Sequence, residues 1–256
     1  IEEQVDFFLH CGDLFDMSNP RNQEVSFAAQ QIARLDSKGI RTFLIVGNHD
    51  MSLNSEAADS SPHSVFEWFK GPNVFMDVED SEPVEIEVED ESISISGLSY
   101  NPVNNGEDPL SDFEGGNDAD WSVLLTHYGI EGTMVSEECK STIRRESIRD
   151  CGLDLICSGH IHSHSEMSLE GTTAVIPGIT ERLDFNEENY STGFYMIYFD
   201  DEVETEYVPL DSQPVESQEK NVEDLENPQR GLKDRIDRIS GEDKMLRFRI
   251  KGRLSR

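Results

Sequence analysis

Short runs of apolar residues recur along the chain, separated by polar or glycine-containing segments. The runs at residues 5–9, 41–46 and 121–126 are nearly continuous, as in strands that are buried on both faces. Between the first two runs, apolar side chains return every three or four residues from 25 to 38. This spacing predicts an amphipathic helix, and Gly39 is suited to end it. The strand–helix–strand order favours a layered α/β domain with a right-handed crossover.

The middle of the chain predicts further strands and two short helices. Residues 84–88 and 92–98 alternate apolar and polar side chains, as half-exposed antiparallel strands do. Residues 64–69 and 141–150 are expected to be helical, and residues 101–120, rich in Gly, Asn, Asp and Pro, are expected to form a loop. The other expected strands are residues 153–157, 174–176, 194–199 and 203–208.

The C-terminal part of the chain is divided by its charge. Residues 211–229 are polar, acidic and without a periodic pattern, which predicts a linker. Residues 229–256 hold 10 Lys or Arg against 4 Asp or Glu, and residues 245–252 alternate basic and apolar side chains like a strand with one basic face. We therefore expect a main domain over residues 1–210, an acidic linker, and the beginning of a small basic domain over residues 230–256.

The basic strand allows two interpretations. Its cations could contact the phosphate backbone of a nucleic acid, or they could protect the edge of a sheet against pairing with another chain. In the first case the contacting residues are Arg247, Arg249, Lys251 and Arg253.

Composition narrows the class of protein. No apolar run approaches the roughly 18 residues that a membrane span needs, and no signal-peptide pattern is present. The 4 cysteines form no CxxC pair, which favours reduced thiols in a cytoplasmic protein over a disulfide framework. The net charge of -32 indicates an acidic interaction surface, partial disorder, or adaptation to high intracellular salt. Because the acids are dispersed through patterned sequence, we favour salt adaptation and a halophilic archaeal source.

Four polar motifs each follow an apolar run, and together they carry metal-ligand chemistry. Asp13 offers two carboxylate oxygens, Asn48 a neutral carbonyl oxygen and His127 an imidazole; on an extended segment His160 and His162 point to the same side. Oxygen and imidazole ligands without cysteine suit a pair of divalent cations such as Mn²⁺, and two such ions about 3.5–4 Å apart support in-line displacement at phosphorus. The motifs are Gly12-Asp13, Gly47-Asn48-His49-Asp50, Thr126-His127 and Gly159-His160-Ile161-His162.

The remaining histidines are interpreted differently. His10 ends an apolar run and is expected to be packed in the interior. His63 lies in a Ser- and Pro-containing segment and is expected to face solvent. His164 continues the alternation of His160 and His162 but is left outside the ligand set.

At these residues the sequence resembles the calcineurin-like metallophosphoesterases, and more closely their SbcD-type DNA double-strand-break repair nucleases. The resemblance covers roughly residues 5–210 and implies a two-sheet mixed β-sandwich flanked by helices, with the beginning of a DNA-capping domain after it. The matching stretches are residues 9–20 (LHCGDLFDMSNP), 43–50 (FLIVGNHD), 157–162 (CSGHIH) and 176–187 (IPGITERLDFNE) followed by Gly193-Phe194.

The resemblance implies a role for each motif residue. Asp13 would bridge two metal ions, His162 would bind one of them, and His49 would be the catalytic histidine. Asp50 would then hold the His49 imidazole, as the general need for outer-shell partners suggests. The other ion would be held by Asn48, His127 and His160.

Two departures from the family pattern stand out. The first motif, an Asp-x-His, is absent, so we expect the chain to be a fragment that begins after it. Asp16 stands where many archaeal members carry a histidine.

The resemblance implies a manganese-dependent DNA nuclease of exonuclease (3′–5′) and endonuclease type, with two divalent ions. Its expected partners are DNA, a coiled-coil ABC-type ATPase and a second copy of itself, and its expected location is the cytoplasm at the nucleoid. Two alternatives stay open: a phosphatase or nucleotide phosphodiesterase on the same scaffold, and a non-catalytic subunit that binds DNA ends.

Overall fold

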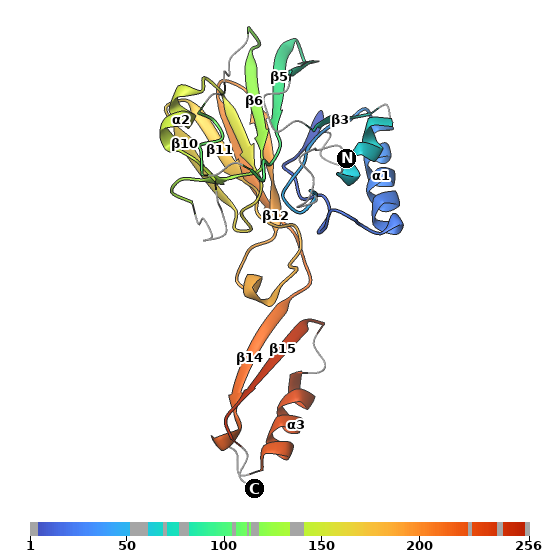
Figure 1. The fold of residues 1–256 in the computed structure, drawn as a ribbon, viewed down its shortest axis with the longest axis vertical. Coiled ribbons are helices and arrows are strands. Elements are labelled where there is room, and N and C mark those ends of the chain that lie inside the picture. The colour runs from blue at the N-terminus through green and yellow to red at the C-terminus, as the bar shows by residue number, and fades with distance from the viewer. Residues whose placement is uncertain are drawn as a thin grey trace. The chain divides into compact units, whose positions relative to one another are not determined.

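A computed structural model of the chain describes residues 5–51, 61–68, 71–76, 82–103, 106–111, 113, 118–133, 141–224, 227–239 and 243–253. The chain forms two compact units (Figure 1). The first comprises Ile1–Gly178 and Met196–Glu206, and the second comprises Ile179–Tyr195 and Tyr207–Arg256. The candidate metal ligands all belong to the first unit.

The smaller sheet of the first unit is parallel, in the order β1-β2-β3, and its crossover helix is α1. This confirms the expected strand–helix–strand opening. Figure 1 shows α1 alongside this sheet. The bounds are β1 (Phe7–His10), α1 (Asn22–Asp36), β2 (Arg41–Ile45) and β3 (Pro72–Phe75), with a 3₁₀ helix, η2 (Pro62–Trp68), before β3.

Residues at both ends of helix α1 explain where it begins and ends. At its start the backbone N–H of Arg21, the residue just before the first turn, donates a hydrogen bond to Glu24 Oε2 at 2.6 Å. Gly39 follows the helix with a φ of +78°, a conformation that glycine adopts without strain. One face of α1 buries Ile32 against Leu44 of β2 and Phe15. The predicted amphipathic helix is thus confirmed.

The larger sheet has the order β10-β11-β9-β6-β5-β4. Its four central strands are parallel, and an antiparallel strand closes each edge. Burial of β6 and β9 on both faces explains their continuous apolar runs, and the edge position of β4 explains its alternation. The alternating segment 92–98 was expected to be half-exposed and antiparallel, but it forms the central strand β5, which pairs in antiparallel with β4 and in parallel with β6. The bounds are β4 (Val84–Val88), β5 (Glu91–Leu98), β6 (Trp121–Thr126), β9 (Leu155–Ser158), β10 (Ser165–Leu169) and β11 (Thr172–Ile176).

The three-stranded and six-stranded sheets of this unit contact each other through Phe75 of β3 and Gly97 of β5. A Cβ atom at Gly97 would overlap the Phe75 side chain, so glycine is required for the approach. On the outer side of the larger sheet, a cluster of apolar side chains packs around helix α2 (Arg145–Asp150). The helix is shorter than expected because β8 (Thr142–Ile143) instead pairs with β7 (Gly129–Ile130). The predicted layered α/β architecture is confirmed.

The segment that we expected to be a linker contains a strand. Strand β14 (Val215–Asn221) pairs in parallel with β15 (Met245–Lys251) over its full length. Helix α3 (Pro228–Ile239) connects the two and lies beside them in Figure 1, and Arg235 of α3 donates to Gln218 Oε1 at 2.9 Å. Because β14 is polar and pairs with a strand about 30 residues later in the chain, its local sequence pattern does not predict it.

The second unit also contains a short loop helix, η3 (Phe185–Glu187), and η4 (Val222–Asp224). Strands β12 (Gly193–Phe199) and β13 (Val203–Pro209) form a two-stranded sheet, and each strand runs from one unit into the other.

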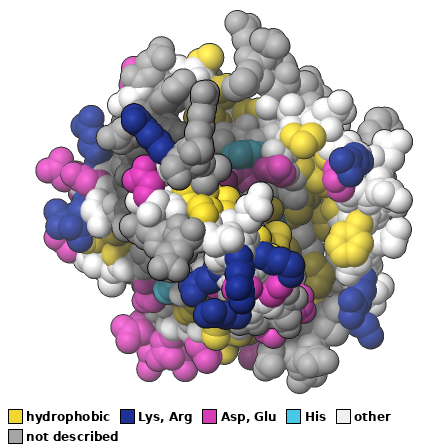
Figure 2. Space-filling view, turned by 90° about the horizontal axis from the view of Figure 1, so that it is seen from below, with side chains coloured by type: hydrophobic (Ala, Val, Ile, Leu, Met, Phe, Trp, Pro, Cys, Tyr) yellow, Lys and Arg dark blue, Asp and Glu magenta, His cyan; other side chains and the backbone are white. Residues whose placement is uncertain are grey.

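Charged side chains of both signs lie on the face shown in Figure 2, with acidic side chains at several separate places and Lys and Arg between them. Across the described part of the chain, no helix has the length and apolar character needed to cross a membrane.

Candidate metal centre

The candidate ligands lie at the carboxyl ends of four strands. Asp13 follows β1, Asn48 follows β2, His127 follows β6 and His160 follows β9. In each sheet these strands are parallel neighbours, so their ends lie at one edge. The arrangement brings side chains 147 residues apart in sequence to one place, which is what the strand-end motifs predict.

Three glycines allow these loops to approach closely. A Cβ atom at Gly12 would lie 2.5 Å from His127 Nδ1 and 2.9 Å from the Cα of Gly47. A Cβ at Gly47 would overlap the Asp13 carboxylate, and one at Gly159 would overlap the carbonyl of Cys11. The glycines of the GD, GNHD and GH motifs are therefore required for space.

Two of the candidate ligands have strained backbones. Asp13 has a φ of +54° and His160 a φ of +71°, in the left-handed region that non-glycine residues rarely adopt. Such conformations cost on the order of 1–3 kcal/mol and cluster at functional sites. Here they direct a carboxylate and an imidazole toward the same point.

The donor atoms of four residues converge. Asn48 Oδ1 lies 2.9 Å from His127 Nε2 and 2.8 Å from His160 Nδ1, and His127 Nε2 lies 3.1 Å from Asp13 Oδ2. Adjacent ligands about 2.1 Å from one octahedral ion would be separated by about 3 Å. These separations therefore fit donors that share a divalent cation.

The amide of Asn48 is central to this arrangement. Among the described residues, no group of three or more His, Cys, Asp or Glu side chains is by itself arranged to hold a metal ion. The four-residue set depends on the amide oxygen, toward which both histidines point.

The His127 ring is oriented by a main-chain carbonyl on the side away from the other candidate ligands. Its Nδ1 lies 2.5 Å from the carbonyl oxygen of Cys11, so Nδ1–H donates there and Nε2 faces the other ligands. A carbonyl that orients a ligating histidine in this way is a common outer-shell feature of metal sites.

Asp13 and His127 form an ion pair. Although burial opposes ionisation of Asp13, the His127 imidazole beside it and the donated N–H of His49 lower the pKa of Asp13 to about 2. Burial likewise opposes protonation of His127, but the Asp13 carboxylate and the Cys11 carbonyl raise the pKa of His127 above its usual value. A cation that binds here would replace the His127 proton.

His160 is prepared to act as a neutral ligand. Burial and the neighbouring His127 lower the pKa of His160 to about 4, and His162 acts in the same direction. The side chain of His162 is exposed, and the converging contacts among the other four candidate ligands do not include it. His160 and Asn48 are half-buried and His127 is buried.

His49 is exposed and held by the loop that carries Asp13. Its backbone N–H donates to Asp13 Oδ1 at 2.9 Å. Its Nδ1 lies 3.1 Å from the carbonyl oxygen of Asp16 and 3.7 Å from the carboxylate of the same residue. The opposite nitrogen, Nε2, therefore points away from this loop.

Asp50 does not have the role that we expected. Its carboxylate is fully buried and accepts hydrogen bonds from the backbone N–H groups of Gly47 at 2.9 Å and Phe15 at 3.0 Å. The His49 imidazole is held by Asp16 instead. Asp50 joins the Asp13 loop to the GNHD loop, because two buried N–H groups from different segments need one acceptor.

The expectation that His63 faces solvent is also wrong. Its side chain is 0% exposed and lies between the rings of Phe15 and Phe66. Its Nδ1 is 3.0 Å from Ser61 Oγ, and its Nε2 is 3.9 Å from Asp50 Oδ2. Of the two rings that enclose His63, Phe15 is distant in sequence, so the local pattern around residue 63 does not predict its burial. His10 is packed against the interior as expected, and burial lowers its pKa to about 4.

The family-specific stretch at residues 180–187 is part of the second unit, where its polar side chains form internal bonds. Arg182 donates to the carbonyl of Tyr190 and to Ser212 Oγ, both at 2.7 Å. Buried Glu187 accepts from the N–H groups of Leu183 and Asp184. These contacts build the loop that contains η3.

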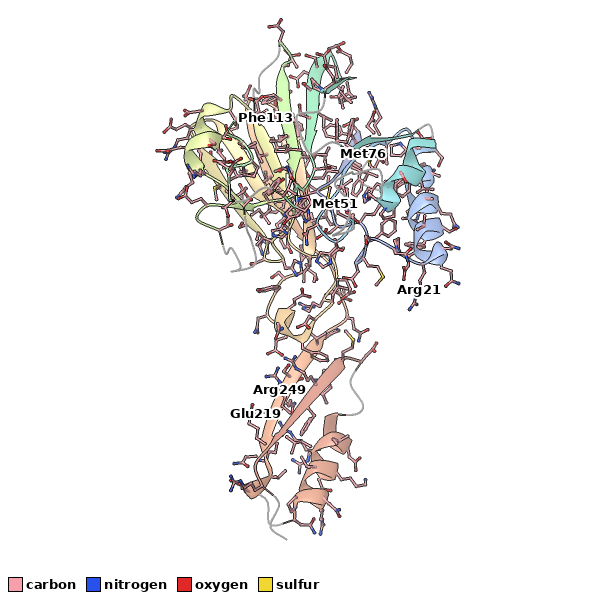
Figure 3. All side chains as sticks on the ribbon, in the orientation of Figure 1. Arg21, Met51, Met76, Phe113, Glu219 and Arg249 are labelled. Carbon is pink, nitrogen blue, oxygen red and sulfur yellow. The ribbon has the colours of Figure 1, made fainter. Side chains whose placement is uncertain are left out.

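Two of the four candidate nucleic-acid contacts are already engaged within the second unit. The Arg247 guanidinium lies 4.9 Å from the centre of the Phe185 ring and its Nε donates to Ser217 Oγ, while Lys251 Nζ is 2.7 Å from Glu219 Oε2. Glu219 is also the pairing partner of Arg249, and Figure 3 shows these two residues close together. The strand's charge is thus partly balanced by β14. Arg249, Lys251 and Arg253 are exposed.

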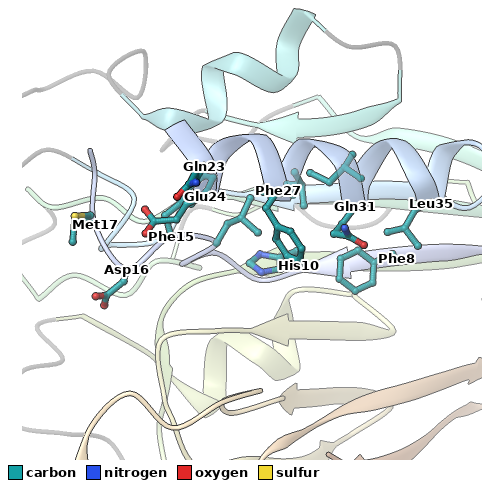
Figure 4. A pocket seen from close by; sticks show the side chains of 14 residues that line it. Phe8, His10, Phe15, Asp16, Met17, Gln23, Glu24, Phe27, Gln31 and Leu35 are labelled. Carbon is teal, nitrogen blue, oxygen red and sulfur yellow. The ribbon is translucent and has the colours of Figure 1, made fainter. Parts of the chain in front are cut away.

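A cavity of about 680 Å³ lies between α1 and β1. Figure 4 shows Phe27 of α1 and Phe8 of β1 on its walls, and both side chains are exposed. None of the candidate metal ligands lines it. Its walls are mostly apolar, and its charged lining residues, Asp16 and Glu24, would repel a phosphate.

Comparison with known proteins identifies the family of the chain. Residues 1–164 match the family described as calcineurin-like phosphoesterase. The chain belongs to this family. Calcineurin-like phosphoesterases use divalent metal ions and hydrolyse phosphoesters, and the matched residues include every candidate ligand.

Several relatives share most of the chain at modest identity. The uncharacterized metallophosphoesterase YhaO of Bacillus subtilis is 27% identical over 199 residues, which is 77% of this chain and 46% of that protein. The DNA double-strand break repair protein Mre11 of Sulfolobus acidocaldarius is 28% identical over 172 residues, 67% of this chain and 42% of Mre11. A subunit of the SbcCD nuclease of Bacillus subtilis is 24% identical over 172 residues, 66% of this chain and 41% of that subunit. The chain thus matches less than half the length of each.

Proposed function

We propose that this chain is the catalytic part of a DNA nuclease of double-strand break repair, which hydrolyses phosphodiesters with two Mn²⁺ ions. The proposal is supported above all by the convergence of His127 Nε2 and His160 Nδ1 on Asn48 Oδ1, with Asp13 beside them. The names of the Mre11 and SbcCD relatives point to DNA as the substrate. By the same analogy, an ABC-type ATPase and a second copy of the protein would be its partners.

In this proposal Asp13, Asn48, His127 and His160 hold one divalent ion, and Asp13 with His162 contributes to the other. When bound, such ions would polarise the phosphodiester and activate a water molecule. Asp13 suits a bridging position because one of its oxygens faces His127 and the other accepts from the His49 N–H.

His49 is the residue that we propose to contact the substrate. Its Nδ1–H donates to the Asp16 carbonyl, so Nε2 faces away from this loop. With the imidazole protonated at both nitrogens, Nε2–H would donate a proton or hydrogen bond to an oxygen of the scissile phosphate. A positioned acid of this kind typically accounts for about 10²–10⁴ of a rate enhancement.

The test compares wild type with His49→Ala in the intact protein. We expect the variant to bind Mn²⁺ with the affinity of wild type, since His49 is outside the ligand set, and to cut linear DNA at least about a hundredfold more slowly. Isothermal titration with Mn²⁺ and cleavage of end-labelled duplex measure the two properties. Equal cleavage rates would show that His49 has no catalytic role.

One observation favours a second candidate, a phosphatase or nucleotide phosphodiesterase on the same scaffold. The basic side chains that would attract a polyanion are partly paired within β14–β15, and the chain carries a net charge of -32. Turnover of p-nitrophenyl phosphate and cyclic nucleotides, measured beside linear DNA, distinguishes the two. If a small phosphoester is hydrolysed and DNA is not, the second candidate is correct.

A further inference from the structure

Tyr100 lies beside the candidate metal centre although no motif marks it. It follows β5 by two residues, and its backbone N–H donates to the carbonyl of Val46 at 2.9 Å. Val46 directly precedes the GNHD loop. The residue is therefore joined by its main chain to the segment that carries Asn48.

The ring of Tyr100 contacts both imidazoles that point at Asn48. It stacks on His160 with ring centres 5.8 Å apart and an interplanar angle of 27°. It meets His127 at 88°, with centres 6.2 Å apart. The two histidine rings are themselves 5.3 Å apart, so Tyr100 borders both of them at once.

Tyr100 is in turn held by Tyr128, whose ring stacks on it at 5.5 Å. The Tyr128 hydroxyl accepts from the N–H of Asn101 at 2.7 Å and donates to the carbonyl of Ser99 at 3.3 Å. These bonds attach the segment on both sides of Tyr100 to a buried residue. The position of the Tyr100 ring is thus fixed before any cation binds.

The two histidines differ in what orients them. Rotation of an imidazole about its second side-chain torsion is soft, so other contacts must set the ring plane. His127 has its bond to the Cys11 carbonyl. His160 Nδ1 contacts the oxygen of Asn48, which would bind the metal ion instead once an ion is present. A contact that remains is the stacking of the Tyr100 ring on the face of His160.

We propose that Tyr100 is a positioning residue of the metal centre: its ring holds the His160 imidazole in the plane in which Nδ1 reaches the cation shared with His127. The inference rests on the proposed metal centre. Tyr100 would act through packing of its aromatic ring, so phenylalanine should replace it and an aliphatic side chain should not.

The experiment uses Tyr100→Leu and Tyr100→Phe, with Phe199→Leu as the matched control. Phe199 also makes two ring contacts in the same unit, with Phe7 and Trp121, but touches no candidate ligand. Isothermal titration with Mn²⁺ at pH 7.5 measures affinity, and ¹H–¹⁵N spectra of the metal-free imidazoles report the His160 ring. If Tyr100→Leu does not fold, Tyr100→Met, which fills more of the space without a flat ring, replaces it.

We expect Tyr100→Leu to weaken Mn²⁺ binding by about tenfold or more, as loss of an outer-shell partner does, and to shift the His160 ring signals. Tyr100→Phe and Phe199→Leu should bind within about twofold of wild type. Wild-type affinity and unchanged His160 signals in Tyr100→Leu would overturn the inference, as would a loss in Tyr100→Phe equal to that in Tyr100→Leu. If wild type itself binds no divalent ion, the proposed centre fails and this role fails with it.

Discussion

At the scale of single residues, the partners of each side chain decide which histidines and carboxylates could bind a metal ion and which support the site, since the candidate ligand His127 is nearly as buried as Asp50 and His63. Asp50, the last residue of the GNHD loop, and His63 are fully buried, whereas His49 and His162 are exposed. A buried carboxylate that accepts two backbone N–H groups cannot reach a substrate. Asp50 is therefore better understood as a structural connection between two ligand loops than as a catalytic group.

His63 predicts how the stability of the metal-free protein depends on pH. Burial lowers the pKa of His63 to about 4, below the value of about 6.5 in an unfolded chain, so the unfolded state binds more protons between these two pH values. The free energy of unfolding should therefore be greatest above pH 6.5 and fall as the pH drops toward 4. His63 alone should contribute about 1 kcal/mol of this loss between pH 7.5 and 5.5.

Urea unfolding at pH 7.5 and 5.5 measures the effect, with His63→Phe as the comparison. Phenylalanine fits between two aromatic rings and does not titrate, so the variant should lose less stability on acidification than wild type. Identical losses in the two proteins would contradict the buried, neutral state of His63.

At the scale of elements, the sequence predicts those parts whose pattern is local. Helix α1 and strand β6 could be foreseen because the spacing of their apolar residues reflects the face that each one buries. Strand β14 could not, because its polar side chains acquire strand structure only by pairing with β15. For the same reason the short parallel strand β3 was missed, since Pro72 and Asn73 favour a turn in isolation.

The sequence predicts those residues of the candidate site that directly follow a strand. The positions of Asp13, Asn48, His127 and His160 follow from four strand ends that meet at the edges of parallel sheets. Tyr100, Cys11 and Asp16 were not foreseen as contacts of the ligands and of His49, because each acts through a ring or a main-chain carbonyl that leaves no motif.

The close approach of the loops gives a prediction at this scale. Gly47→Ala would place a methyl group into the Asp13 carboxylate, so the variant should bind Mn²⁺ at least about tenfold more weakly than wild type. Gly39→Ala is the matched control, because Gly39 has a positive φ but open space around its Cα. The control should lose some stability through backbone strain and keep its metal affinity. Titration of both variants with Mn²⁺ checks this, and equal affinities would contradict the steric argument.

At the scale of the whole molecule, the charge of the chain and its proposed substrate oppose each other. The sequence carries 53 acidic and 21 basic residues, so a polyanion is repelled at a distance. Salt shortens the range of this repulsion to about 3 Å at 1 M, compared with about 10 Å at 0.1 M. A nuclease with this surface would therefore depend on bound cations, and on a partner, to place DNA at the strand ends.

The proposed metal centre depends on one cluster of donor atoms in the first unit. The most direct test is an X-ray structure of crystals grown with Mn²⁺, with anomalous scattering recorded at the manganese edge. We expect a strong anomalous peak within bonding distance of Asp13, Asn48, His127 and His160, and a second peak beside Asp13 near His162. No peak at these residues, at a Mn²⁺ concentration that saturates the protein in solution, would contradict the account.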